Sequence, residues 1–219
     1  MTFTIVPSAK TPATDPEAVS VLCSAYEQEI KRRPLPRTLA ILVAQSALET
    51  GQWDSMWNHN WGNIRGSYRG HSMSIKGADE IIDGRRVTGA EVESGFRAYP
   101  DAVSGAIDFI RFLGVDTTPN NGRPNRYQKA WDAAEAGDVS AYCHELAEAG
   151  YYTASPTLYE KGVRRLVDQF LPLCEAHLGH AKPAPADDTG DLMAEIHEGL
   201  DAAEAGLRRA RAAAARVRV

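Results

Sequence analysis

The sequence predicts a mainly α-helical domain with a small antiparallel β lobe, followed by a C-terminal amphipathic helix. Apolar residues recur at helical spacing before residue 50 and again after residue 101. Between these parts, Gln52–Gly95 loses that spacing and contains short β-prone pieces. The composition of the 219 residues, 43% hydrophobic and 24% charged, is typical of a globular protein.

The first helix is predicted from its start signals. Asp15 is expected to be the N-cap and Pro16 to occupy the first helical position. The helix should run to about Arg33, and residues 1–14 before it are expected to form a flexible leader.

A second helix should follow the break at Pro34 and Pro36 and end at Gly51, where a left-handed cap favours glycine. It is apolar nearly all round, which is typical of a helix at the centre of a core. Its uncharged run, Thr38–Leu48, is about half of the roughly 20 residues needed to cross a bilayer, so no membrane span is expected.

The β lobe is expected within Met73–Val92, with Asp83-Gly84 as a hairpin turn. Asp138 and Ser155 are candidate N-caps for two of the helices that follow. These helices are expected at Asp101–Leu113, Arg126–Ala136, Val139–Ala149 and Thr157–Leu178. Residues 15–179 should therefore form one domain.

The end of the chain has a different composition. Residues 180–190 are a Pro/Ala/Asp linker, and 191–219 form an Ala-rich helix with an apolar stripe and five arginines in its last 12 residues. The stripe consists of Leu192, Ile196, Leu200 and Leu207. It suits self-association or docking to a particle, and packing on the chain's own domain is the alternative.

Composition also excludes several kinds of function. A net charge of −5 argues against binding nucleic acid through a broad basic surface. The three cysteines have no metal-ligand spacing, and neither HExxH nor GxSxG occurs, so no metal or other cofactor is expected. The first residues lack the basic and apolar regions of a secretory signal.

Glu49 is the residue whose position suggests chemistry. A carboxyl group at the end of an apolar helix is partly desolvated, which raises its pKa towards neutrality. A protonated glutamic acid near neutral pH can donate a proton to a leaving glycosidic oxygen. The alternative is a helix-terminal glutamate that points into water.

An aromatic and polar loop follows Glu49 directly. It contains Trp53, Trp57 and Trp61, whose rings could stack on sugar faces, although a buried tryptophan stripe fits the same spacing. The loop also offers polar partners for sugar hydroxyls, Asn58, His59, Asn60 and Asn63.

Two further residues complete a candidate site for glycoside hydrolysis, which commonly uses a pair of carboxylates. Glu80 lies in the β-prone region, where Asp79, Asp83, Glu91 and Glu93 are hard to separate from it by chemistry alone. Tyr151 could stabilise positive charge at the anomeric carbon, or could be a core aromatic residue.

Five segments occur in an order that resembles the glucosaminidase domain of glycoside hydrolase family 73, in the lysozyme-like superfamily. They span about residues 38–170 and read AQSALETG at 44–51, NWGNIRG at 60–66, EIIDG at 80–84, FRAY at 96–99 and AGYYT at 149–153. The resemblance implies an α+β lysozyme-like fold and cleavage of the β-1,4 bond after N-acetylglucosamine in peptidoglycan glycan strands.

The same resemblance implies roles for individual residues. Glu49 would be the catalytic general acid, Glu80 the second carboxylate and Tyr151 the active-site tyrosine. Contacts to the glycan are expected from Gln45, Trp53, Trp57, Asn60, Trp61, Asn63, Arg65 and Tyr152.

Two alternatives accompany this expectation. A muramidase or lytic transglycosylase would cut the other linkage on the same fold, and a wall-binding component of a phage-like particle would keep the fold without turnover. Since no export signal is expected, action on the bacterial cell wall would follow release by lysis, as for an endolysin, or delivery by such a particle.

Overall fold

The computed structural model describes residues 4–74, 80–82, 85–87, 95–115, 125–152 and 154–180, with only the backbone described for 80–82, 85–87, 115 and 180. Residue contacts divide the chain into Met1–His180 and Ala181–Val219. The linker and the amphipathic helix expected after residue 180 lie outside the described residues, as does the Asp83-Gly84 turn.

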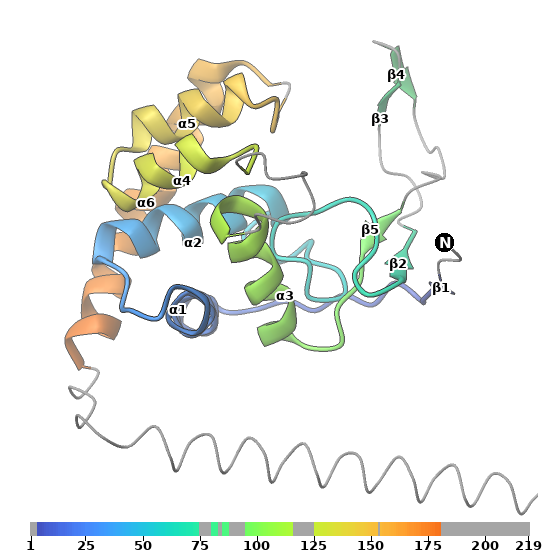
Figure 1. The fold of residues 1–219 in the computed structure, drawn as a ribbon, viewed down its shortest axis with the longest axis horizontal. Coiled ribbons are helices and arrows are strands. Elements are labelled where there is room, and N and C mark those ends of the chain that lie inside the picture. Colours follow the sequence, from blue (N-terminus) through green and yellow to red (C-terminus); the bar gives the residue numbers. More distant parts are fainter. Residues whose placement is uncertain are drawn as a thin grey trace, which may run out of the picture. The chain divides into compact units, whose positions relative to one another are not determined.

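The described part of the first unit is mainly helical, with short strands between the second and third α-helices (Figure 1). The expected mainly α fold with a small β lobe is therefore confirmed. In chain order the elements are β1 (Thr4–Ile5), α1 (Asp15–Ile30), α2 (Pro36–Thr50), β2 (His71–Met73), β3 (Glu80–Ile82), β4 (Arg85–Val87), β5 (Phe96–Arg97), α3 (Ala102–Ile110), a π-helical turn η1 (Arg111–Val115), α4 (Gln128–Glu135), α5 (Val139–Glu148) and α6 (Pro156–His180).

The start of α1 differs by one residue from the expected one. Thr14, and not Asp15, is the N-cap: its side chain accepts a hydrogen bond from the Glu17 backbone N–H, while the Glu17 carboxylate accepts one from the Thr14 N–H. This reciprocal capping box satisfies two backbone donors, which a cap at Asp15 would not do. The helix ends at Ile30, before the expected Arg33.

The residues before α1 are not a loose leader over the part that the structure describes. β1 pairs in parallel with β2, and the backbone N–H of Thr11 donates to the carbonyl of Met56. Ala9 donates its backbone N–H to the side chain of Asn58. The segment is therefore bound to the loop that follows α2, which the local sequence did not reveal.

α2 occupies the centre of the core, as its apolar composition predicts. Every residue from Thr38 to Ala47 is buried, and the helix lies among α1, α4 and α6 (Figure 1). Its most extensive packing is against α6. Gly51 closes it with a left-handed backbone, φ 59°, and its N–H donates to the Ala47 carbonyl.

Two small sheets make up the described β structure. β2 lies between β1 and β5, with β5 antiparallel to it, and β3 pairs with β4 in an antiparallel hairpin in register Ile82↔Arg85. Met73, Phe96 and Ala98 form a second, smaller buried cluster with Val6 and Trp57 against it.

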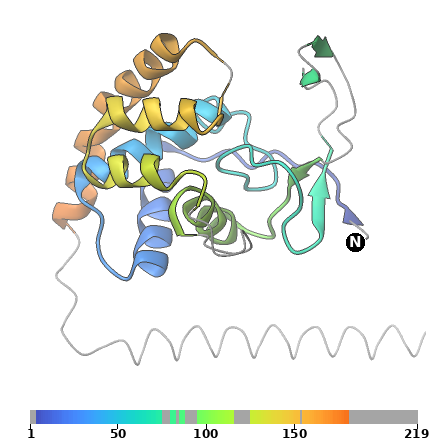
Figure 2. The ribbon, with the colours of Figure 1, turned by 45° about the horizontal axis from the view of Figure 1, so that its top comes forward.

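Of the later helices, α6 and α4 pack against α2, and α5 packs against both of them (Figure 2). α3 packs against α1, α4 packs against α5, and Asp101 and Asp138 cap α3 and α5 by accepting hydrogen bonds from the N–H groups of Ser104 and Ala141. The expected single helix over 101–113 is instead α3 followed by the π-helical turn η1. In the part of the chain that is described, no helix is both long and apolar enough for a membrane span.

Candidate active site

Glu49 lies in the last turn of α2 and is half-buried. The turn is held in place by the buried body of the helix before it and by the left-handed cap at Gly51 after it. Carbonyl dipoles at a helix C-terminus disfavour a negative charge nearby. The local fold therefore favours the protonated form of this carboxyl group.

Two side chains contact the same oxygen of Glu49. Gln45, one helical turn earlier, has its Nε2 at 3.2 Å from Glu49 Oε1, and the hydroxyl oxygen of Tyr159 lies 3.0 Å from that atom. Burial raises the pKa of Glu49 to about 7, and the hydrogen bonds from Tyr159 and Gln45 oppose the rise. At neutral pH a large fraction of Glu49 therefore carries its proton.

Two more tyrosines surround this pair. Burial, and then the charge of the nearby Glu49, raise the pKa of Tyr151 well above its usual value. The pKa of Tyr142 is raised in the same way, by burial first and by a smaller effect of Tyr151. Both hydroxyl groups are buried, and neither makes a hydrogen bond of normal geometry with a described residue, although Gln45 lies near enough to Tyr151 to oppose the rise of its pKa. Tyr151 thus lies near enough to Glu49 for the two groups to interact electrostatically, and its role as the active-site tyrosine stays a prediction.

The loop after α2 is tied back to the helix that carries Glu49. Asn63, with φ 47°, donates its side-chain amide to the backbone carbonyl of Glu49. Ser46 donates its hydroxyl to the Trp61 carbonyl at 2.7 Å and accepts the indole N–H of Trp53 at 3.0 Å. These bonds fix the loop beside the end of α2.

Three residues expected to contact the glycan belong to the interior instead. Trp53 and Trp61 are 0% and 1% exposed, and the Trp61 indole donates to the Ala102 carbonyl. Asn60 is also fully buried, and its side chain bonds the backbone at Ile64 and Arg97. The expectation that these three meet a sugar is wrong in this structure, because their surfaces and polar atoms are already used by the core.

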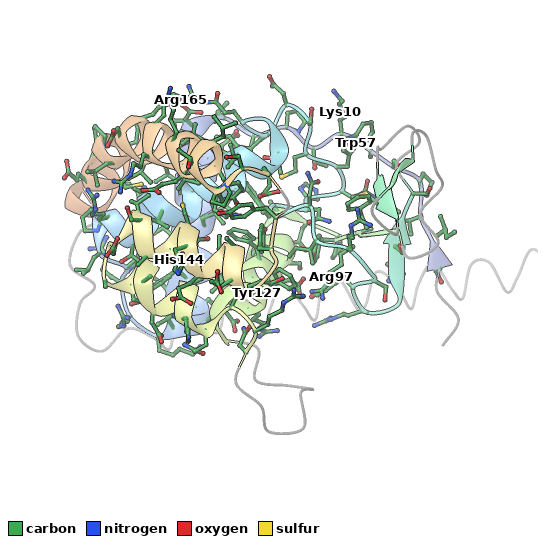
Figure 3. The ribbon with its side chains drawn as sticks, turned by 90° about the horizontal axis from the view of Figure 1, so that it is seen from above. Lys10, Trp57, Arg97, Tyr127, His144 and Arg165 are labelled. Carbon is green, nitrogen blue, oxygen red and sulfur yellow. The ribbon has the colours of Figure 1, made fainter. Side chains whose placement is uncertain are left out.

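The other expected contact residues have different positions. Trp57 is half-buried, with the Lys10 ammonium 5.7 Å from its ring centre (Figure 3). Arg65 is exposed, with its guanidinium 5.6 Å from the Phe96 ring centre. Tyr152 donates its hydroxyl to the Cys143 carbonyl and stacks its ring on Tyr159. Gln45 is also fully buried, so its expected contact with the glycan is wrong in this structure, and its side chain contacts Glu49 instead.

Glu80 is placed in β3 by its backbone, and its side chain lies outside the described residues. Its relation to Glu49 therefore stays a prediction. Tyr159 is the residue that sequence reasoning missed. It is near the start of α6, far from α2 in sequence, and only the packing of α2 against α6 brings it to Glu49.

A pocket of about 370 Å³ lies elsewhere, on the β1 side of the unit. Neither Glu49 nor any side chain described around it lines this pocket, so the chemistry of Glu49, and not the size of a cavity, locates the candidate site. The pocket is lined by Val6, Asn58, Tyr68, Arg69, His71, Ala98, Tyr99, Pro100 and Ser104.

Over the described ranges, no three His, Cys, Asp or Glu side chains are grouped in a way that could hold a metal ion. The described groups around Glu49 are the amide of Gln45 and the phenols of Tyr159 and Tyr151.

The sequence and the fold are both similar to those of known proteins. Residues 23–171 match the model of the glucosaminidase family, described as mannosyl-glycoprotein endo-beta-N-acetylglucosaminidase. A comparison with curated protein sequences gave no significant match.

Two solved structures share the fold. The catalytic domain of the autolysin Auto from Listeria monocytogenes is 21% identical with a TM-score of 0.53, over 76% of this chain and 90% of the other. A peptidoglycan hydrolase mutant from Sphingomonas sp. A1 is 23% identical with a TM-score of 0.50, over 74% of this chain and 99% of the other. The expected lysozyme-like fold is confirmed. Since the family model covers more than half of the sequence, the chain belongs to the glucosaminidase family and is a glycoside hydrolase.

Proposed function

We propose that this chain hydrolyses the β-1,4 bond after N-acetylglucosamine in peptidoglycan, acting on the bacterial cell wall as an endo-β-N-acetylglucosaminidase. The observation that carries the proposal is Glu49, a carboxyl group whose pKa is raised to about 7 by burial at the end of a core helix. A general acid works best when its pKa is near the working pH. The similar fold of a peptidoglycan hydrolase supports the choice of polymer.

In the proposed reaction, the Glu49 proton moves to the glycosidic oxygen as the bond between that oxygen and the anomeric carbon breaks. The sugar then carries positive charge at the anomeric carbon, and the Tyr151 phenol stabilises it. Water adds to this carbon, and a second carboxylate, for which we propose Glu80, accepts the proton of the water. The leaving chain keeps the proton that Glu49 gave, and the proton taken up by the second carboxylate returns to Glu49 through solvent, so the sum of the steps is hydrolysis.

Replacing Glu49 by glutamine tests the proposal, because the amide keeps the size of the side chain and cannot donate the same proton. Glu49→Gln should lower the rate of lysis of purified cell walls by at least roughly a thousandfold, in the range expected for loss of a general acid and its charge. Turbidity of a wall suspension measures the rate. Glu175→Gln, an exposed change on α6, should leave it unaltered.

The linkage is tested on the same digests. Mass spectrometry of the released muropeptides should find N-acetylglucosamine at the reducing ends. Reducing-end N-acetylmuramic acid or an anhydro product would instead assign the chain to the muramidases or lytic transglycosylases. Full lysis by Glu49→Gln would refute Glu49 as the acid, and absence of any lysis by the unmodified chain would favour a wall-binding component.

A further inference from the structure

Tyr159 is fixed beside the proposed acid by the packing of two helices. It lies in the first turns of α6, is 8% exposed, and its hydroxyl oxygen is 2.8 Å from Gln45 Oε1 and 3.0 Å from Glu49 Oε1. Its ring stacks on Tyr152 with centres 3.6 Å apart and planes 11° from parallel. The ring would keep this position without its hydroxyl group.

The hydroxyl has one proton and two acceptors within reach. While Glu49 is neutral, the phenol can donate to Gln45 Oε1, the shorter of the two contacts. Once Glu49 has given up its proton, its Oε1 is charged and becomes the stronger acceptor. The phenol can then donate to it. The Tyr159 hydroxyl therefore favours the state that Glu49 reaches by giving its proton away.

The same contacts also orient the carboxyl group. Gln45 Nε2 and the Tyr159 hydroxyl both meet Oε1, and no described residue donates a hydrogen bond to Oε2. A carboxyl group held at one oxygen has a fixed plane. This leaves Oε2 as the oxygen that carries and delivers the proton.

We propose that Tyr159 is a positioning residue for Glu49, which holds Oε1 through a hydroxyl shared with Gln45 and stabilises the carboxylate formed when the proton is delivered. This role rests on the proposed function of Glu49. Tyr159 acts only through Glu49, because it is buried and its hydroxyl is already bonded within the protein.

Tyr159→Phe tests the proposal, since it removes the hydroxyl and keeps the stacked ring. We expect kcat on soluble glycan fragments to fall roughly tenfold, as for loss of one hydrogen bond to a charged group, with KM unchanged. The alkaline limb of the pH profile of kcat should move to higher pH. The reason is that Tyr159 is one of the two groups that lower the pKa of Glu49 against the effect of burial.

Tyr26→Phe is the matched control. The Tyr26 hydroxyl also donates to a glutamate, Glu135 Oε1 at 2.5 Å, but in the packing of α1 against α4. This variant should lose stability without any shift of the pH profile.

The possible outcomes separate the claims. An unchanged kcat and pH profile in Tyr159→Phe would overturn the positioning role, as would a loss of activity that only follows thermal stability and is matched by Tyr26→Phe. If Glu49→Gln remains active, the proposed function fails first, whatever Tyr159→Phe does.

Discussion

At the scale of single residues, folding opposes the ionisation of Glu49. Burial raises its pKa from an ordinary 4.5 to about 7. Between these two pH values, Glu49 keeps its proton in the folded protein but has released it in the unfolded chain. The stability contributed by the neutral form is complete below about pH 4.5 and is lost as the pH rises through 7. Above that pH, the native state holds a poorly solvated charge.

Glu49→Gln removes this ionisation and should therefore stabilise the protein at alkaline pH. We expect its free energy of unfolding at pH 8 to exceed that of the unmodified chain by about 3 kcal/mol, because each unit of the pKa shift from 4.5 to about 7 corresponds to about 1.4 kcal/mol. At pH 4.5 the two proteins should be nearly equal. Urea unfolding at both pH values measures the difference, and a difference that does not change with pH would contradict the raised pKa.

At the scale of elements, the site depends on how closely α3 approaches the loop that follows α2. A Cβ atom added at Gly105 in α3 would lie 2.0 Å from the carbonyl oxygen of His59 and 3.1 Å from Trp61. Both neighbours are within the loop that is bonded to the end of α2. Only glycine permits this contact, because the carbonyl belongs to the backbone and cannot rotate away.

Gly105→Ala should destabilise the protein by about 3 kcal/mol, since overpacking against backbone forces the helix or the loop to shift. Thermal unfolding measures the effect. Gly179→Ala is the control: it is also a change within a helix, but nothing lies within 4 Å of the added atom. That variant should show no loss, and a small gain from helix propensity. Equal losses of stability in both variants would show that the close contact at Gly105 is not the cause.

The sequence predicted those elements whose signals are local. The cap at Gly51 and the buried length of α2 appear in the structure as expected, whereas Pro36, expected to belong to the break, is the first residue of the helix. The pairing of β1 with β2 was missed because it joins residues far apart in the chain and has no local pattern. The π-helical turn after α3 was missed for a similar reason, since its residues also suit an α-helix.

The residues of the candidate site also differ in whether a local sequence signal predicts their contacts. Glu49 and Gln45 are one helical turn apart, so their contact can be read from spacing alone. Tyr159 reaches them only through tertiary packing, and the burial of Trp53 and Trp61 depends on which side of the loop meets the core. A tryptophan near an acid has the same sequence signal whether it binds a sugar or fills the interior.

At the scale of the whole molecule, the division at residue 180 predicts that the helical unit functions alone. Its buried hydrophobic residues lie between Ala18 and Cys174, and the family match ends at residue 171. A chain ending at His180 should therefore unfold at the same temperature as the full chain and cleave soluble glycan fragments at the same rate. Calorimetry and a reducing-sugar assay measure these two properties.

Lower stability or slower cleavage in the shortened chain would mean that residues 181–219 support the first unit. The truncation also tests the expected self-association through residues 191–219. If that helix joins copies, light scattering should find fewer chains per assembly for the shortened chain than for the full chain. If it does not, the number of chains per assembly should be the same for both.

The contact between α2 and α6 also affects when the protein becomes active during its synthesis. Glu49 leaves the ribosome early, whereas Tyr159 belongs to the last helix of the unit, so the two meet only when translation of the domain is nearly complete. A prematurely terminated chain that lacks α6 therefore has the proposed acid, Glu49, without the proposed positioning residue, Tyr159. Because α2 packs most extensively against α6, we expect such an incomplete chain not to reach the folded state.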